Sequence, residues 1–537
     1  MSTPDGTPPP DPDELGPAAV LGPPTEAALN RGALQERAVR GVTWTMIHTA
    51  VAIPVAFVVN LLIARVLGVE DYGRLAFLTA LMEFVSGLLA SGFGAAVMQF
   101  GSKAHAAGRT QEVAALLSKW QGFRVLFAMP ILSLVVVFAT DVTPAAVAIA
   151  VIFGVVLPST LDGAAACLGI ENKTAAGAKI TLITSLVTQA AVVAVLLLVG
   201  SAEAVWFTRL IVSGLAIAMC LIPISKAYRR AVLRPALPRH LPPGFLRFAV
   251  LMGASGVIGG LVTSRSEIFV MNAIATPAAV GIFALAFGLS SHVFAPAQAF
   301  AFPLIPAISG LREVDSDSVP AAFRRVMRVG STVVGLLSAG VIAPLAALVP
   351  SLYGEQFSQA APVVVALSIS AGLVTCFTPV YAFVTSRLSG GSILKANIVA
   401  LALDLALAFA LIPSIGVWGA VIANAAGALT TLTILLRLEL RQLGLRALDL
   451  LGDTMPVYVG AVVAAVAFFA SEGLEVPAVV RAIALGVLGT AAYLGVVRLL
   501  RSGLTPTDAE VLSRGLPRFV RPVGGLMVRL ITGRAPA

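Results

Sequence analysis

Apolar stretches of about 18 or more residues recur along this chain from Val42 to Leu499. Each is long enough to cross the roughly 30 Å hydrocarbon core of a bilayer as an α-helix. Strands of a membrane barrel are only about ten residues long and alternate in polarity, which these stretches do not. Charged residues make up 12% of the chain, against about 25% in soluble domains. We therefore expect an all-α, polytopic membrane protein.

Glycine, proline and charged residues divide the apolar sequence into about fourteen predicted transmembrane helices. They lie near residues 42–66, 75–100, 120–140, 144–169, 178–199, 203–224, 248–273, 278–304, 329–350, 361–386, 394–413, 416–437, 454–471 and 477–498.

The positions of the basic residues predict the orientation of these helices, because cytoplasmic loops are enriched in Lys and Arg. A cytoplasmic N-terminus places most of the 36 basic residues on the cytoplasmic side and leaves Arg65, Arg74 and Arg481 outside. We expect a multi-pass protein of the inner (cytoplasmic) membrane with both termini in the cytoplasm. The net charge of +9 then reflects this topology and an affinity for anionic membrane lipids, rather than nucleic-acid binding.

Composition also delimits the ends and the middle of the chain. Residues 1–38 are rich in proline and contain no apolar core, which predicts a disordered cytoplasmic tail rather than a cleaved signal peptide. Residues 226–247 form a basic cytoplasmic linker. Residues 441–500 carry the last two helices, and 501–537 are an amphipathic cytoplasmic tail with a short helix expected at 505–512.

Two weak internal sequence similarities suggest a duplication. Gly73 and Gly281 punctuate similar segments 208 residues apart, and Ala-Val-Trp at 204–206 is echoed by Gly-Val-Trp at 416–418. Equivalent helices would share one orientation, so the repeat would be parallel, with lobes at 39–225 and 248–440. Chance similarity between apolar helices is the alternative.

Several segments together resemble the bacterial polysaccharide flippases of the multidrug/oligosaccharidyl-lipid/polysaccharide exporter superfamily. They are RVLGVEDYGRLAF (65–77), SRSEIFVMN (264–272), VPSLYGEQFSQAAPVVVALSI (349–369) and NIVALALDLALAFALIPSIGVWGAVIA (397–423). The resemblance implies two six-helix lobes around a central cavity, with two further C-terminal helices. It also implies an undecaprenyl-diphosphate-linked or related polyprenyl-diphosphate-linked oligosaccharide as cargo. We expect no cofactor.

Six ionisable residues lie inside the predicted spans. Each costs about 2.5–3.5 kcal/mol at the centre of a bilayer, so none should face lipid. They are Glu83, Asp162, Arg209, Arg265, Glu267 and Asp404.

Arg265 and Glu267 point to different sides of their helix, because residues two apart do not face each other. We expect Arg265, which shares its side with Asn272, to hold a diphosphate or an acidic sugar, since a guanidinium pairs well with phosphate oxygens. Glu267 would tether the helix to a neighbour. The alternative is that an acid such as Glu83 neutralises Arg265. The resemblance favours the cargo role, although relatives more often carry Asp where this chain has Glu267.

Arg209 lies near the outer end of its helix, where snorkelling to the interface competes with substrate binding. Glu83, Asp162, Glu267 and Asp404 are candidates for proton or sodium coupling or for charge pairing, because an acid in low dielectric can bind a cation. The three cysteines fall within spans, and we expect neither a metal site nor a catalytic residue.

No nucleotide-binding loop, nucleophile elbow or zinc-protease motif occurs in the sequence, which favours a transporter over an enzyme. We expect a flippase that works by alternating access for cell-surface polysaccharide synthesis. A drug/cation antiporter of the same superfamily is the main alternative, although the intramembrane arginine would repel cationic drugs. A glycan polymerase or ligase would want a large outer loop, and a structural scaffold is a further alternative. The oligomeric state stays open, with a monomer favoured.

Overall fold

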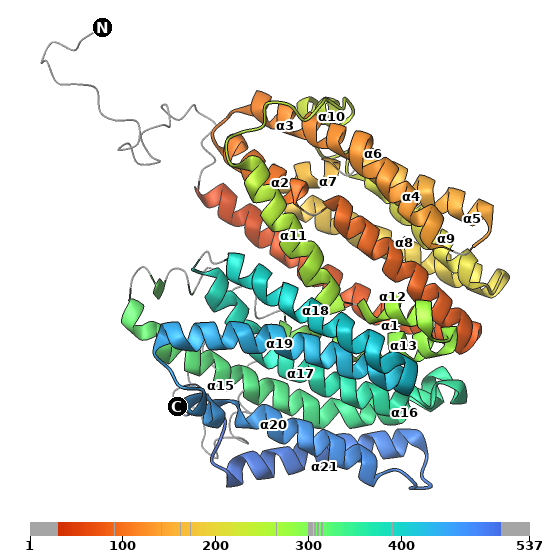
Figure 1. Cartoon of the computed structure of the whole chain (residues 1–537), viewed down its shortest axis with the longest axis vertical. Coiled ribbons are helices and arrows are strands. Elements are labelled where there is room, and N and C mark those ends of the chain that lie inside the picture. Colours follow the sequence, from red (N-terminus) through yellow and green to blue (C-terminus); the bar gives the residue numbers. More distant parts are fainter. Residues whose placement is uncertain are drawn as a thin grey trace, which may run out of the picture. The chain divides into compact units, whose positions relative to one another are not determined.

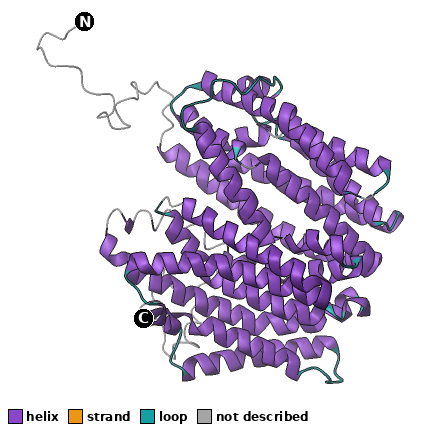
Figure 2. Ribbon diagram, viewed as in Figure 1, coloured by secondary structure: helices purple, strands orange, loops and turns teal. Residues whose placement is uncertain are grey.

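The computed structural model describes residues 31–90, 92–140, 142–161, 163–171, 173–264, 266–298, 304, 308, 311–312, 315–387, 390–505 and 508. Within these ranges the chain forms helices and connecting turns without a strand (Figure 2). The α-helices are α1 (Arg31–Ala90), α2 (Phe93–Ala106), α3 (Thr110–Phe123), α4 (Met129–Ala139), α5 (Pro144–Ile149), α6 (Leu157–Leu161), α7 (Gly163–Ile170), α8 (Thr174–Leu198), α9 (Ala202–Met219), α10 (Lys226–Val232), α11 (Phe245–Ser264), α12 (Ser266–Ile274), α13 (Pro277–Gln298), α15 (Val319–Leu337), α16 (Ala343–Tyr353), α17 (Ala360–Thr385), α18 (Gly390–Ile415), α19 (Val417–Leu443), α20 (Ala447–Ala470) and α21 (Ala478–Leu499).

Shorter elements join several of these helices into continuous runs. π-Helical turns occur at Arg124–Ala128, Ala150–Val156 and Ser338–Ile342, and 3₁₀ turns occur at Ser316–Ser318 and Glu355–Phe357.

Thirteen helices of the described chain are long and apolar enough to cross a membrane. This confirms an all-α protein with many spans. The first of them, Ile47–Gly87, has 41 residues and would be about 60 Å long if straight, twice the thickness of the hydrocarbon core. It covers parts of the first two predicted spans, so the number fourteen stays a prediction.

Gly68 bends α1 between those two predicted spans. Its backbone angles, φ 77° and ψ 178°, are readily reached only by glycine. Across the bend, the Asn60 side-chain amide donates to the Tyr72 hydroxyl at 3.0 Å. The Tyr72 ring packs edge-on against Phe357, with ring centres 5.9 Å apart. The bend is therefore held by side-chain contacts on both sides.

The helices form two compact units (Figure 1). Unit 1 comprises Met1–Phe57, Leu88–Val192 and Phe207–Gly253, and unit 2 comprises Val58–Gly87, Val193–Trp206 and Ala254–Ala537. The boundaries fall inside α1, α8, α9 and α11, so single helices contribute to both units. The lobes that we inferred from the repeat stay a prediction.

An aromatic cluster forms much of the core of unit 1. Phe93 of α2 stacks on Trp120 and Phe123 of the run that begins with α3, with ring centres 5.3 and 4.8 Å apart. Phe245 of α11 meets the same ring edge-on at 4.8 Å. Helices distant in sequence are thus joined by aromatic contacts, which add specific geometry to the burial of apolar area.

The basic linker packs along α3 in unit 1. It contains α10, whose Tyr228 and Val232 are buried. The Ser118 hydroxyl donates to the carbonyl of Ala231 at 3.0 Å, and the backbone N–H of Ala236 donates to the Ser118 carbonyl at 2.9 Å. The linker is therefore a folded part of unit 1.

In unit 2, α20 packs on α15, and α21 packs on α16 and α20 (Figure 1). Small residues permit this close approach. A Cβ on Gly335 would lie 2.3 Å from the carbonyl oxygen of Pro456, and a Cβ on Gly460 would lie 2.2 Å from that of Gly335. Glycine at helix crossings is typical of membrane proteins, where dispersion contacts between backbones replace the hydrophobic effect.

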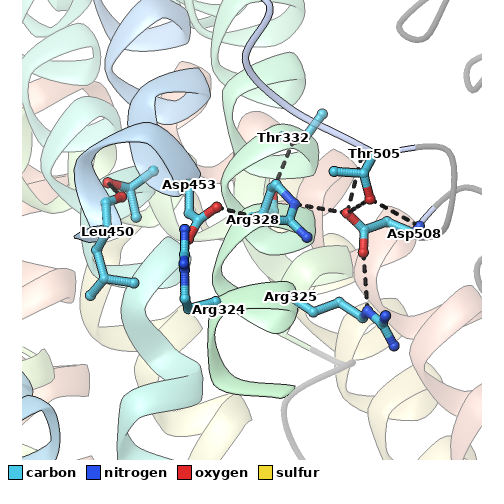
Figure 3. A network of polar contacts seen from close by, with 9 residues as sticks. Arg324, Arg325, Arg328, Thr332, Leu450, Asp453, Thr505 and Asp508 are labelled. Carbon is cyan, nitrogen blue, oxygen red and sulfur yellow. Dashed lines mark hydrogen bonds and ion pairs between the residues drawn. The ribbon is translucent and has the colours of Figure 1, made fainter. Parts of the chain in front are cut away.

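An ion-pair network ties the segment after α21 to α15 and α20 (Figure 3). Arg328 donates to Asp453 at 2.8 Å and to Asp508 at 2.7 Å, and Arg325 donates to Asp508 at 3.1 Å. Arg324 donates to Asp453 at 2.7 Å. The Asp508 carboxylate also accepts from the Thr505 hydroxyl at 2.6 Å.

Asp508 consequently stays ionised. Burial raises its pKa, but the hydrogen bonds from Arg328 and Thr505 outweigh burial, so its pKa lies below the ordinary value.

Two predicted tails fall largely outside the described residues. The first helix begins at Arg31, inside the segment 1–38 that we predicted to be a disordered tail, because Ala33-Leu-Gln-Glu-Arg-Ala38 consists of good helix formers. Residues 1–30 are not described. The helix expected at 505–512 and the amphipathic segment after it are described only at Thr505 and Asp508.

Candidate functional site

One buried polar site in the described part of unit 2 combines Glu267 of α12, Asp404 of α18 and Asn424 of α19. Their exposures are 0%, 1% and 9%. The Asn424 side-chain amide donates to Glu267 Oε1 at 2.8 Å. The Ser266 hydroxyl donates to Asp404 Oδ2. Three helices thus supply two carboxylates and their first hydrogen bonds.

Local sequence explains how these helices come so close. Gly416, with φ 58°, separates α18 from α19, which lets the two pack as a hairpin. Gly427 of α19 faces Asp404, because a Cβ there would lie 2.9 Å from the Asp404 Cβ. Only glycine leaves enough room for the carboxylate at this crossing.

Apart from the contact between the two carboxyl groups themselves, Glu267 Oε2 and Asp404 Oδ1 have no hydrogen-bond partner in the described chain. No Lys or Arg of the described residues forms an ion pair with either acid. Two buried charges of one sign without a counterion would be strongly destabilising. The arrangement suits a bound proton or a small hard cation, since carboxylate and carbonyl oxygens are the ligands such cations prefer.

Glu267 and Asp404 are the predicted site residues that the structure brings together. Asn272 lies on α12 and is exposed. Glu83 lies on α1 and is exposed, on a stretch whose Phe84 packs against Phe269 of α12 with ring centres 5.7 Å apart. Arg209 is half-buried on α9 in unit 1. Arg265 and Asp162 lie outside the described residues.

The sequence reasoning missed one buried arginine. Arg124 is 1% exposed in a π-helical turn, with its guanidinium 5.1 Å from the ring centre of Trp120. The predicted span 120–140 puts Arg124 near a helix end, but α3 begins at Thr110, so Arg124 lies well inside the helical run. The spacing of four between an aromatic residue and an arginine was the available signal.

A buried acid was missed as well. Glu439 of α19 is fully buried and accepts hydrogen bonds from Arg312 at 3.0 Å and from Arg387. Glu439 directly follows the predicted span 416–437, where the sequence resembles an ordinary cytoplasmic loop. Its two partners are 127 and 52 residues away, which no local pattern reveals.

The chain is similar in sequence to one protein family. The sequence model of a family described as polysaccharide biosynthesis protein matches residues 38–310. No curated protein sequence matches the chain significantly.

Three solved structures with the same fold illustrate the likeness. A lipid II flippase MurJ in an inward closed conformation is 13% identical, covers 84% of this chain and 98% of its own, and superposes with a TM-score of 0.62. A variant of the Vibrio cholerae MATE transporter VcmN is 16% identical over 77% of this chain and 99% of its own, with a TM-score of 0.52. An inward-facing multidrug resistance MATE transporter of the MOP superfamily is 14% identical over 74% and 99%, with a TM-score of 0.54.

Proposed function

The chain belongs to the polysaccharide biosynthesis protein family, and from that premise we propose that it flips a polyprenyl-diphosphate-linked oligosaccharide across the cytoplasmic membrane. The family match over 38–310 is the observation that carries the cargo class. Alternating access is the proposed mechanism, because a lipid-linked sugar must be exposed first to one side of the membrane and then to the other. Both termini would lie in the cytoplasm.

We propose that the buried cluster of Glu267, Asp404 and Asn424 couples transport to an ion gradient. A carboxylate pair that forms no ion pair with a described Lys or Arg can bind and release a proton or a sodium ion. Binding of the cation would remove the repulsion between the two acids and favour one packing of α12 against α18 and α19. A ligand that binds one conformation better shifts the equilibrium toward it, which is how an ion gradient would drive the cycle.

For cargo recognition we propose Arg265, with Asn272 and Arg209 as further candidates. A guanidinium supplies a permanent charge and paired donors for diphosphate oxygens. Arg265 lies outside the described residues, so this assignment rests on its place in an apolar segment next to Ser266 and Glu267.

Reconstitution into proteoliposomes tests the cargo. A fluorescent polyprenyl-diphosphate-linked oligosaccharide should change leaflet faster in vesicles that contain the protein. Arg265→Ala should slow translocation about tenfold or more, since a charge-assisted hydrogen bond contributes roughly 1.5–3 kcal/mol. Arg265→Lys should retain part of the rate, and Arg74→Ala, at an exposed site, should retain all of it. Equal rates in protein-containing and empty vesicles would reject the flippase.

A multidrug/cation antiporter is the second candidate, because two of the similar folds belong to MATE transporters and an acid pair also suits cation antiport. Vesicles with an imposed ion gradient distinguish the two functions. Uptake of a cationic dye, with no movement of the glycan lipid, would favour the antiporter.

A further inference from the structure

A cavity of about 260 Å³ lies in unit 2, away from the acid cluster. It is lined by Val384 of α17, Arg387, Ser392 of α18, and Leu438 and Gln442 of α19. Its polar groups are a guanidinium, a hydroxyl and a primary amide, and the described residues of the lining include no acid. Such a wall offers hydrogen-bond donors and a positive charge beside two aliphatic side chains.

A buried ion pair fixes the position of Arg387. Glu439 is fully buried and accepts from Arg387 Nη2 and from Arg312 Nη2, the latter at 3.0 Å. Arg312 is held in turn by a hydrogen bond from its Nε to the Ser386 hydroxyl at 2.9 Å. Two guanidiniums share one carboxylate, so the cluster keeps one net positive charge.

Arg387 also keeps unused hydrogen-bonding capacity. A guanidinium has five N–H donors, and Glu439 occupies Nη2. Arg387 Nε is buried and has no partner in the described part of the chain. The Arg387 side chain is 20% exposed and lines the cavity, so an oxyanion there can pair with the N–H groups of the guanidinium that Glu439 leaves free.

The surroundings favour an anion in the same place. Ser392 lies in the first turn of α18, where unpaired backbone N–H groups and the helix dipole attract negative charge. These helix ends are the ones that the distribution of Lys and Arg predicts to face the cytoplasm. Leu438 is 37% exposed and can contact an acyl chain.

We propose that this cavity binds a phosphate group, supplied by the headgroup of an anionic phospholipid in the adjacent leaflet or by soluble phosphate. Arg387 provides the charge and the forked donors, and Ser392 and Gln442 provide neutral donors. Val384 and Leu438 suit the glycerol and acyl portion of a lipid, which soluble phosphate lacks. Binding to this site is measured without transport, so the result does not depend on the proposed cargo.

Lipid binding to the purified full chain tests the site. Native mass spectrometry and thermal unfolding in detergent would compare phosphatidylglycerol, phosphatidylcholine and inorganic phosphate. Gln442→Leu and Ser392→Ala remove donors without touching the ion pair of Glu439, so both variants should fold. We expect each to bind phosphatidylglycerol about tenfold more weakly, and Arg387→Gln to bind it more weakly still. Arg441→Ala is the matched control, an exposed arginine next to Gln442 that does not line the cavity.

The outcomes separate the two sources. Tight binding of phosphatidylglycerol that is lost in Gln442→Leu and kept in Arg441→Ala supports the lipid site. Saturable stabilisation by inorganic phosphate, lost in the same variants, supports the phosphate site and assigns it to a soluble anion. Equal affinity of wild type and Gln442→Leu for both ligands, or no preference over phosphatidylcholine, would overturn the proposal.

Discussion

Gly73 and Gly281 make reciprocal contacts in unit 2. A Cβ on Gly73 would lie 1.9 Å from the carbonyl oxygen of Pro277, and a Cβ on Gly281 would lie 2.2 Å from that of Val69. Val69 and Pro277 are 208 residues apart, as are the two glycines. A two-fold axis through a contact pairs residue i with j and j with i. Any two segments that pack antiparallel show this reciprocity, so the contact fixes the crossing of α1 and α13, and the parallel repeat stays a prediction.

Substitution of either glycine should therefore destabilise the protein to a similar degree. Each new methyl group would collide with backbone, which cannot move aside easily, so Gly73→Ala and Gly281→Ala should each cost about 1–3 kcal/mol. Thermal unfolding in detergent measures this cost. Gly288→Ala on α13 is the control, because a Cβ there meets nothing within 4 Å. Similar losses in all three variants would contradict the assigned crossing.

Removal of the amide that contacts Glu267 should weaken the acid cluster. Asn424→Leu takes away the donor 2.8 Å from Glu267 Oε1 and leaves a buried acceptor unsatisfied, at a cost of about 2 kcal/mol. The same change at exposed Asn272 should cost much less. Melting temperatures of the two variants provide the comparison, and equal values would mean that the hydrogen bond is not formed.

Asp508 predicts an acid-dependent loss of stability. Because its pKa is lowered in the folded protein, its contribution is present at neutral pH and is lost as the pH falls below about 4. Asp508→Asn should lower the free energy of unfolding by on the order of 2 kcal/mol at pH 7. This difference from wild type should shrink as the pH falls below about 4. Asp317→Asn, at an exposed site, should behave like wild type throughout. A pH-independent difference would contradict the proposed ion pairs.

Tyr228 predicts an alkaline effect in the linker. Burial and the nearby Glu171 raise the pKa of its hydroxyl to about 12. The hydroxyl lies 2.9 Å from His105 Nδ1. Tyr228→Phe should lose about 1 kcal/mol at neutral pH. The unfolded chain ionises near pH 10, so wild type should lose this advantage between pH about 10 and about 12. Unfolding across this range, with exposed Tyr381→Phe as control, checks the effect.

Much of the fold could be predicted because membrane helices are recognisable in a sequence as long apolar segments. The predicted span 361–386 corresponds to α17, Ala360–Thr385, and 477–498 corresponds to α21, Ala478–Leu499. Helix starts were less predictable where a helix extends beyond its apolar segment. The third predicted span began at 120, whereas α3 begins at Thr110, because hydropathy does not register the polar first turns.

The site was only partly predictable. The cost of a buried charge identified Glu267 and Asp404 separately, but residues 137 positions apart in the sequence carry no local sign that they will meet. Asn424 and the small residue Gly427 complete the cluster through packing of α18 against α19. Asp453 and Asp508 share Arg328 for the same reason, since a tertiary contact alone brings them together.

Gradient-dependent translocation tests the central claim, that two buried acids couple a cation to the flipping of a lipid-linked glycan. Proteoliposomes would carry an imposed proton or sodium gradient and a fluorescent polyprenyl-diphosphate-linked oligosaccharide. We predict that one of these gradients accelerates translocation by wild type, and that Glu267→Gln combined with Asp404→Asn abolishes the acceleration while the protein stays folded. An undiminished gradient response in the double variant would contradict the account.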